Sequence, residues 1–131
     1  MGIVYKSQGH YERALEYYQK SLDIKIKVVG HDHISVANTY NNIGEVYRSQ
    51  GHYERALEYY QQSLDINIKV VGHDHIDVAT SKYNLALLHK GRRETEKARQ
   101  LFLECEQTYS AVYGPDHSET QDAARQASLC V

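Results

Sequence analysis

The chain lacks tryptophan and has little proline, cysteine or methionine: one proline, two cysteines and one methionine among 131 residues. Cys105 and Cys130 are too few for the disulfide framework of a small secreted protein. No stretch approaches the roughly 20 apolar residues that cross a bilayer, and no apolar signal-peptide region follows Met1. We therefore expect a reducing, cytoplasmic setting and no membrane partner. Because Pro115 is the single proline, long uninterrupted helices are allowed.

The chain also has no large excess of either basic or acidic residues. The formal net charge is −2, which does not favour a nucleic-acid partner. Hydrophobic residues make up 41% of the chain and charged residues 24%, which are ordinary proportions for a soluble globular domain. Tyrosine, by contrast, is abundant, with twelve residues against one phenylalanine. A chain of this length buries roughly two-thirds of its surface, so it needs no disulfide or metal to hold a core.

The sequence repeats itself with a fixed offset. Residues 51–79 copy residues 9–37 at 26 of 29 positions, and the offset is 42 residues. A third, weaker copy continues this offset, since Ala14, Ala56 and Ala98 are each 42 residues apart. One such unit cannot bury its apolar face alone, but stacked copies cover one another. The sequence therefore predicts an array of stacked repeats.

Each repeat reads as a long helix followed by a shorter one. Apolar residues of the first long helix recur every three or four positions, as along one helical face: Tyr11, Ala14, Leu15, Tyr18, Leu22, Ile26 and Val29. Gly30 is expected to end this helix, and Asp32 is expected to cap the next one. Residues 2–8 copy residues 44–50, so a truncated helix is expected there. The other predicted helices are 10–29, 33–50, 52–71, 75–91, 94–113 and 117–130.

One turn departs from the repeat pattern. Arg93 stands where Gly51 closes the equivalent shorter helix, and Gly91 comes two residues earlier. A turn that needs a positive φ disfavours arginine. We therefore expect this shorter helix to end early, near Lys90, and a longer loop to follow.

The repeat resembles the tetratricopeptide repeat. That family's pattern of a large aromatic, Leu-Gly, Tyr, Ala, an aromatic and a small residue is matched by Tyr40, Ile43-Gly44, Tyr47, Ala56, Tyr60 and Ser63. In the next unit, Lys82 departs from the aromatic residue and His89 from the tyrosine. The 42-residue unit, with its Asn-Asn-Ile-Gly segment, is similar to the kinesin-light-chain variety of the repeat. The resemblance implies an all-α fold, a right-handed α-solenoid of stacked antiparallel helix hairpins, whose shorter helices line a concave groove that binds protein or peptide without catalysis.

The repeat boundaries follow from this resemblance. We expect residues 1–131 to form a single repeat domain. Its parts are a partial first repeat, a second repeat, a third repeat and a C-terminal capping helix, at 1–30, 31–72, 73–114 and 115–131 respectively.

A ligand in such a groove would touch the face of each shorter helix that points away from the core. Asn42, Asn84 and Gln126 form a column of amides, which can donate to and accept from the backbone of an extended peptide. Arg48 and Lys90 belong to a column of cations that would attract acidic side chains or a terminal carboxylate. A merely solvated surface is the alternative interpretation, since exposed helix faces are polar anyway. The candidate peptide-binding residues are Asn38, Asn41, Asn42, Glu45, Arg48, Thr80, Tyr83, Asn84, Leu87, Lys90, Arg125 and Gln126.

The histidine-rich turns suggest a metal site at first sight. Residues 31–33 and 73–75 both read His-Asp-His, but such a pair supplies two ligands where zinc sites use three or four. We interpret these turns as structural and predict no metal and no cofactor; a weak Zn²⁺ or Ni²⁺ site shared between turns is the alternative. No catalytic residue is predicted either, because no nucleophile or phosphate-binding motif occurs. Cys105 falls on the buried small position of its helix, where it acts as a small hydrophobic residue.

The sequence thus predicts a protein–protein interaction scaffold, not an enzyme, that binds an extended and acidic peptide in its concave groove. The alternative is a structural element that stacks or dimerises through its exposed repeat edges, with a second copy as partner. Tyr17 and Tyr59 bear on this alternative. We expect them either to pack against the next repeat or to form a second contact surface on the convex side, which would suit self-association.

Overall fold

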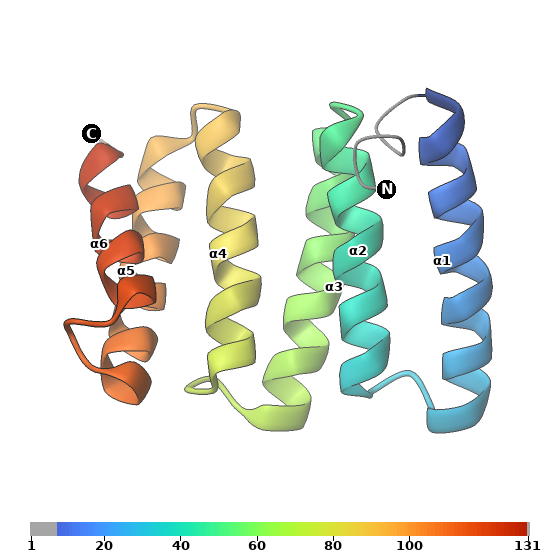
Figure 1. Cartoon of the computed structure of the whole chain (residues 1–131), viewed down its shortest axis with the longest axis horizontal. Coiled ribbons are helices and arrows are strands. Elements are labelled where there is room, and N and C mark those ends of the chain that lie inside the picture. The colour runs from blue at the N-terminus through green and yellow to red at the C-terminus, as the bar shows by residue number, and fades with distance from the viewer. Residues whose placement is uncertain (1–7, 131) are drawn as a thin grey trace. The chain divides into compact units, whose positions relative to one another are not determined.

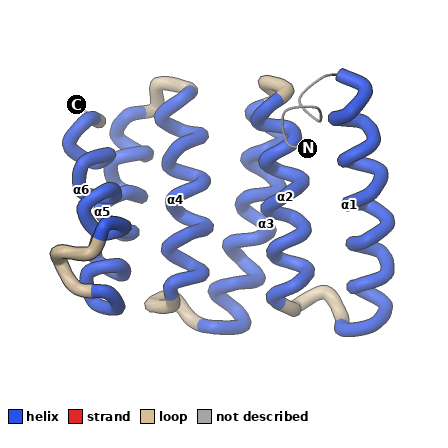
Figure 2. Tube along the Cα trace, in the orientation of Figure 1, coloured by secondary structure: helices blue, strands red, loops and turns tan. Residues whose placement is uncertain are grey.

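The computed structural model describes residues 8–130, with side chains described from His10 onward. Within that range the secondary structure consists of α-helices joined by short turns, without a strand (Figure 1, Figure 2). The all-α prediction is confirmed, and each helix boundary lies within two residues of its predicted position. The truncated helix expected over residues 2–8 lies, except for its last residue, outside the described residues. The helices are α1 Gln8–Val29, α2 Ile34–Ser49, α3 Tyr53–Val71, α4 Ile76–Gly91, α5 Thr95–Tyr113 and α6 Ser118–Leu129.

The chain divides into two compact units, Met1–Val70 and Val71–Val131. The first unit contains α1, α2 and nearly all of α3, and the second contains α4, α5 and α6. Within each unit, consecutive helices run in opposite directions (Figure 1). Each unit is therefore built from antiparallel helix hairpins.

The apolar core of the first unit is centred on α2. Its members are Leu22 from α1, Val36, Ala37, Tyr40 and Ile43 from α2, and Ile66 from α3. No member is more than 7% exposed. Because α2 contacts a helix on each side, it needs apolar residues over a wide sector of its surface, and the three- and four-residue spacing supplies them.

Tyrosines and one glycine hold the hairpin of α2 and α3 together. Tyr47 of α2 stacks on Tyr59 of α3, with ring centroids 5.5 Å apart and an interplanar angle of 18°. Gly44 of α2 lies against the ring of Tyr60, which is 1% exposed. A Cβ atom at residue 44 would lie 2.8 Å from two carbons of that ring. The small residue of the repeat pattern is therefore what lets these two helices approach closely.

Two apolar clusters can be described within the second unit, among residues 79–130. One contains Ala86, Ala98, Phe102, Ala127 and Cys130, and the other contains Ala79, Cys105, Tyr109 and Ala123. Cys105 is fully buried, and its Sγ–H donates to the carbonyl oxygen of Ala79 at 3.1 Å. The expectation of a buried, small core residue is thus confirmed. Burial raises the pKa of the Cys105 thiol to about 12, so the reactive thiolate is not available at neutral pH.

An ion pair and a hydrogen bond replace two tyrosines of the repeat pattern in the hairpin of α4 and α5. Lys82 Nζ lies 2.7 Å from Glu104 Oε1 of α5. Burial acts to raise the pKa of Glu104, but the hydrogen bonds from Lys82 and Gln100, together with the charge of Lys82, outweigh it and lower that pKa below its ordinary value. His89 Nδ1 lies 3.0 Å from Oε1 of Glu94, next to α5. Polar pairs therefore close this hairpin where stacked rings close the preceding one.

Histidine, and not aspartate, caps the shorter helices. The Nδ1 atoms of His33, His75 and His117 accept the backbone N–H of the second helical residue, at 3.0, 3.0 and 3.1 Å. The prediction that Asp32 caps α2 is wrong, because the extended backbone of a cap (φ −138°, ψ 146°) falls one residue later, at His33. Asp32 instead accepts from Lys69 at 2.7 Å. The repeated His-Asp-His turns thus have a structural use.

The longer loop predicted after the shorter helix that precedes Arg93 is also wrong, although that helix ends at Gly91, one residue beyond the predicted Lys90. α2 and α4 both have 16 residues, and a turn of the same length follows each. Arg93 adopts φ 62° where Gly51 has φ 82°. The same two backbone hydrogen bonds, 3.0 and 2.9 Å long, close both turns. They fix the turn geometry even though an arginine in this conformation costs roughly 1–2 kcal/mol.

Candidate binding surface

The predicted residues of the first unit come from α2. Asn38 and Asn42 are exposed, whereas Asn41, Glu45 and Arg48 are half-buried. The cation of Arg48 is compensated, since its Nη2 lies 2.5 and 3.2 Å from the two carboxylate oxygens of Glu45. This helix therefore offers exposed amides and a closed ion pair to a ligand.

Lys90 and Gln126 meet in the second unit, although 36 positions separate them in the sequence. The Nζ of Lys90 on α4 donates to Oε1 of Gln126 on α6 at 2.7 Å. Among the residues that the structure describes, no carboxylate pairs with Lys90. The other N–H groups of the lysine and the amide N–H groups of Gln126 could therefore donate together to a carboxylate.

Tyr83, Asp122 and Arg125 form a connected group beside this pair. The Tyr83 hydroxyl donates to one oxygen of Asp122, and Arg125 pairs with the other. Burial and the hydrogen bond to Asp122 raise the pKa of Tyr83 to about 12, so this hydroxyl keeps its proton. The Tyr83 ring packs edge-on against Phe102, with ring centroids 5.3 Å apart. The group is thus fixed in position, and Asp122 neutralises Arg125.

A pocket of about 570 Å³ opens in the second unit between α4, α5 and α6. It brings together three predicted residues, Thr80, Tyr83 and Arg125, whereas Leu87 packs against the Phe102 cluster instead. Tyr109, which is not among the predicted residues, also lines the pocket, and its hydroxyl lies 3.2 Å from Thr80 Oγ1. Tyr109 belongs to the long helix α5, whereas the predicted ligand contacts all lie on the shorter helices. The lining residues are Thr80, Tyr83, Tyr109, Ser118, Glu119, Gln121, Asp122 and Arg125.

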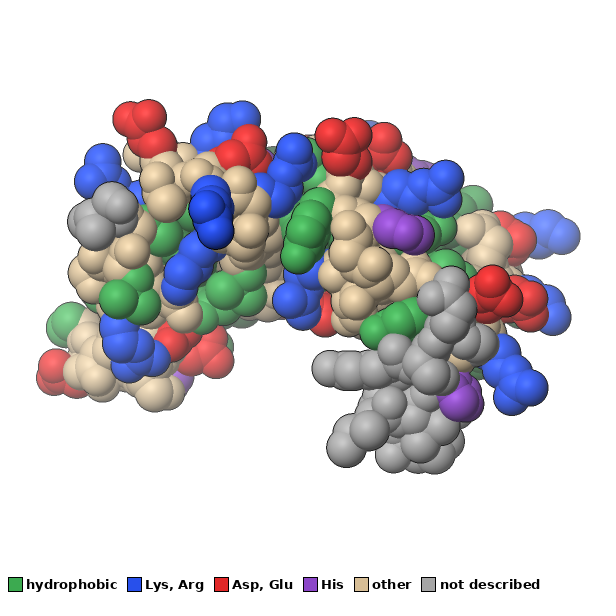
Figure 3. Space-filling model, turned by 90° about the horizontal axis from the view of Figure 1, so that it is seen from above, with side chains coloured by type: hydrophobic (Ala, Val, Ile, Leu, Met, Phe, Trp, Pro, Cys, Tyr) green, Lys and Arg blue, Asp and Glu red, His purple; other side chains and the backbone are tan. Residues whose placement is uncertain are grey.

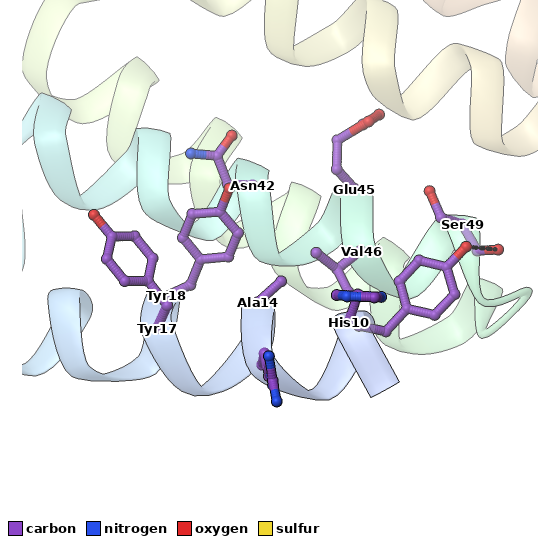
Figure 4. A pocket seen from close by; sticks show the side chains of 10 residues that line it. His10, Ala14, Tyr17, Tyr18, Asn42, Glu45, Val46 and Ser49 are labelled. Carbon is purple, nitrogen blue, oxygen red and sulfur yellow. Dashed lines mark hydrogen bonds between the residues drawn. The ribbon is translucent and has the colours of Figure 1, made fainter. Parts of the chain in front are cut away.

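A second pocket, of about 710 Å³, lies between α1 and α2. Figure 4 shows Tyr17 and Tyr18 of α1 beside Asn42 of α2, and Ala14 between them and His10. At the other end of the pocket, the Tyr11 hydroxyl is 3.4 Å from the Ser49 carbonyl oxygen. Sequence reasoning found Asn42 and Glu45 but not the contribution of α1. The lining residues are His10, Tyr11, Arg13, Ala14, Tyr17, Tyr18, Asn42, Glu45, Val46 and Ser49.

The described residues hold no group of three or more histidine, cysteine, aspartate or glutamate side chains placed to bind a metal ion. None of the helices described here is both long enough and apolar enough to span a bilayer. On the face shown in Figure 3, basic and acidic side chains are interspersed with polar and hydrophobic ones. No large block of one charge thus stands out on that face.

Comparison with known proteins identifies the repeat. The profile of the tetratricopeptide repeat matches residues 1–69 and 53–111. BtubC (BKLC) from P. vanneervenii superposes with a TM-score of 0.82 at 21% identity, over 94% of this chain and 48% of that one. A Podosopora anserina structure described as "kinesin light chain nearly identical TPR-like repeats" gives 0.82 at 17% identity, over 96% of this chain and 60% of that one. This chain therefore spans about half the length of the first protein. No curated protein sequence matches it.

Antiparallel helix pairs recurring every 42 residues define an α-helical repeat protein of the solenoid class. The chain belongs to the tetratricopeptide repeat family, and it shares its fold with kinesin-light-chain-like repeats. The predicted family is thus confirmed. Tetratricopeptide repeats mediate protein–protein interaction, and proteins of this fold are typically scaffolds without catalytic activity.

Proposed function

We propose that this protein binds an extended peptide along the exposed polar faces of its shorter helices, and that a carboxylate of the peptide docks at Lys90. The observation that carries the proposal is the pairing of Lys90 with the neutral amide of Gln126 at 2.7 Å. A lysine paired in this way keeps its positive charge for a ligand. Glu45 and Asp122, by contrast, neutralise Arg48 and Arg125.

The exposed amides of α2 support the peptide part of the proposal. Asn38 and Asn42 are exposed on this helix, although asparagine is a poor residue for a helix interior. A primary amide can donate to a peptide carbonyl and accept from a peptide N–H. Such contacts hold an extended peptide backbone whatever its sequence. Lys90 adds a preference for peptides that carry a carboxylate.

The pocket beside Lys90 suits the neighbouring part of the same peptide. Its hydroxyl and carboxylate groups include those of Thr80, Tyr109 and Glu119, and the fixed ring of Tyr83 forms part of the wall. Rigid tyrosine rings are enriched in binding surfaces because they bury a large area at a small entropic cost. We place this binding activity in the cytoplasm, since both cysteines are free thiols, as expected for a reducing compartment.

A random peptide library displayed on phage, selected against the whole immobilised protein, tests the proposal. We expect the selected peptides to be enriched in aspartate, glutamate or a free C-terminal carboxylate. Lys90→Gln should then weaken the binding of the selected peptides about tenfold, as measured by fluorescence anisotropy, because a charge-assisted hydrogen bond is lost.

Lys27→Gln is the matched control, since it removes the same charge from an exposed lysine in the last turn of α1. This variant should bind the selected peptides like the unaltered protein. Selected peptides without acidic enrichment would contradict the proposal. Equal losses of affinity in the Lys90 and Lys27 variants would contradict it as well. They would show that the affinity depends on the overall charge of the protein and not on the position of Lys90.

A further inference from the structure

The pocket of about 570 Å³ in the second unit has an excess of negative charge. Its charged lining residues are Glu119, Asp122 and Arg125. Arg125 pairs with Asp122, so these two charges cancel. Glu119 is exposed in the first turn of α6, and its carboxylate pairs with no cation among the residues that the structure describes. One carboxylate of the pocket wall is therefore left without compensation.

The hydroxyl groups of the same pocket have already donated their protons. Thr80 Oγ1 donates to the carbonyl oxygen of Ile76 at 3.1 Å, so the 3.2 Å hydrogen bond between Thr80 and Tyr109 uses the proton of Tyr109. Tyr83 donates its proton to Asp122. A hydroxyl group carries one proton but can accept further hydrogen bonds with its lone pairs. Thr80 and Tyr109 can therefore offer only acceptors to a ligand in the pocket.

The charge of Glu119 acts on these acceptors. Burial raises the pKa of Tyr109 to about 12, and the negative charge of Glu119 adds to the increase. The Tyr109 hydroxyl therefore keeps its proton at neutral pH, and it lies within the electric field of the carboxylate. A negative field together with oxygen lone pairs favours a ligand that is positively charged and rich in N–H groups.

We infer that this pocket binds the guanidinium of an arginine in the same peptide that docks its carboxylate at Lys90, which makes the inference dependent on the proposed function. A guanidinium has five N–H donors and no acceptor, so it can donate to several oxygens at once. It would form an ion pair with Glu119 and hydrogen bonds with the oxygens of Thr80 and Tyr109. Guanidinium planes also stack on aromatic rings, and the ring of Tyr83 forms part of the same wall.

The positions of the two contacts set the spacing of acid and arginine in the peptide. Lys90 and Gln126 lie near the C-terminal ends of α4 and α6, and Thr80 and Glu119 lie near their N-terminal ends. Thr80 and Lys90 are ten residues apart on α4, which is about 15 Å along the helix axis. An extended peptide covers this distance with about four or five residues. We therefore expect the arginine about four or five residues from the acid.

Nα-acetyl-L-arginine amide is the probe for the pocket alone, titrated into the whole isotope-labelled protein and followed by NMR. It should shift the backbone amide signals of Thr80 and Glu119 in a saturable way, with a Kd on the order of 10 mM. The corresponding citrulline derivative has a similar shape without the charge, so it should bind at least about tenfold more weakly. Glu119→Gln should weaken the binding of the arginine derivative about tenfold, because the ion pair is lost.

Glu96→Gln is the matched control, because Glu96 is an exposed acid in the first turn of α5 and lies outside the pocket. This variant should bind the arginine derivative like the unaltered protein. Because Glu119 is exposed, thermal unfolding of Glu119→Gln should stay close to that of the unaltered protein. Lys90→Gln should not weaken the binding of the arginine derivative, since that probe carries no carboxylate.

A double-mutant cycle tests the contact within the peptide. Peptides selected from the random library should carry an arginine at the expected spacing from the acid. Citrulline in place of this arginine should weaken binding to the unaltered protein about tenfold, but cause little further loss with the Glu119→Gln protein, since the two charges act as a pair.

Three results would overturn the inference: no saturable shift up to about 50 mM arginine derivative, equal affinities of the Glu119 and Glu96 variants for it, or additive losses in the cycle. Selected peptides enriched in acid but not in arginine would overturn it as well, and would leave the docking of a carboxylate at Lys90 intact. Binding of the arginine derivative, together with selected peptides that lack acid, would support the arginine pocket and contradict the docking at Lys90. The two failures can therefore be told apart.

Discussion

Gly44 and Tyr60 are packed so closely that no side chain larger than hydrogen fits between the two helices. A Cβ atom on residue 44 would lie 2.8 Å from Cδ1 and Cε1 of the ring, and the ring is 1% exposed. Neither partner can move away without opening the core. The contact thus explains, in physical terms, why the repeat pattern has a small residue opposite an aromatic one.

Gly44→Ala is therefore expected to destabilise the protein. Overpacking of a filled core costs about 1–3 kcal/mol, which exceeds the helix-propensity gain of about 1 kcal/mol from replacing glycine by alanine. Gly91→Ala is the matched control, because nothing lies within 4 Å of the added Cβ at the end of α4. That variant should be stabilised by a few tenths to about 1 kcal/mol. Urea unfolding of both variants measures the difference, and equal shifts would contradict the packing argument.

Arg93→Gly should stabilise the protein by about 1 kcal/mol, because glycine adopts a positive φ without the steric cost that arginine bears. The reverse change, Gly51→Arg, should destabilise it by a similar amount, since Gly51 has φ 82° in the equivalent turn. Thermal unfolding of the two variants provides the measurement. If both changes shift the midpoint in the same direction, backbone conformation does not explain the effect.

Loss of a histidine cap should weaken the start of a helix. The Nδ1 of His75 accepts the N–H of Asp77 at 3.0 Å, so His75→Ala leaves that donor without its side-chain acceptor. The expected loss of stability is about 1 kcal/mol. His75→Asn keeps an acceptor at the cap and should retain most of the stability. Chemical denaturation compares the two, and an asparagine variant as unstable as the alanine variant would argue against the capping role.

The buried phenols should make the protein sensitive to alkali. Burial raises the pKa of Tyr60 and of Tyr109 to about 12, against an ordinary value of about 10. Between these values the unfolded chain releases the phenolic protons while the folded chain keeps them, so stability is intact below about pH 10 and falls as pH rises towards 12. Tyrosinate absorbance and circular dichroism should therefore change together on alkaline titration.

Tyr60→Phe provides the control for the alkaline transition. It removes one buried ionisable group while keeping the ring that lies against Gly44. The midpoint of alkaline unfolding should rise in this variant. An unchanged or lower midpoint would show that ionisation of Tyr60 does not contribute to the transition.

The helices could be predicted from the sequence because the same spacing occurs three times and each helix has one apolar face. The capping residues could not, because Asp32 and His33 are both reasonable at a helix start, and the choice depends on a one-residue shift in backbone conformation. The turn at Arg93 was mispredicted for a related reason. Local steric cost favoured a different turn, but the two backbone hydrogen bonds that close it prevailed.

Single positions of the candidate surface could be predicted, but their pairing could not. Thr80, Tyr83 and Arg125 do line one pocket, as periodicity indicates for an exposed helix face. The spacing rules describe one helix at a time, so they cannot show that Asp122 neutralises Arg125 or that Lys90 reaches Gln126. Those contacts depend on how α4 and α6 pack within the second unit.

The near identity of α1 and α3 also bears on how the chain reaches its native pairing. While the protein folds, α2 meets two helices with almost the same sequence. α1 and α3 therefore compete for the same contacts with α2. The misfolding expected from this competition is the exchange of a helix between two molecules. One of the two positions at which the copies differ counters this ambiguity. Lys25 of α1 donates to Thr39 of α2 at 2.9 Å, and α3 has the shorter Asn67 at that position. A single lysine side chain thus makes the contact of α2 with α1 different from its contact with α3.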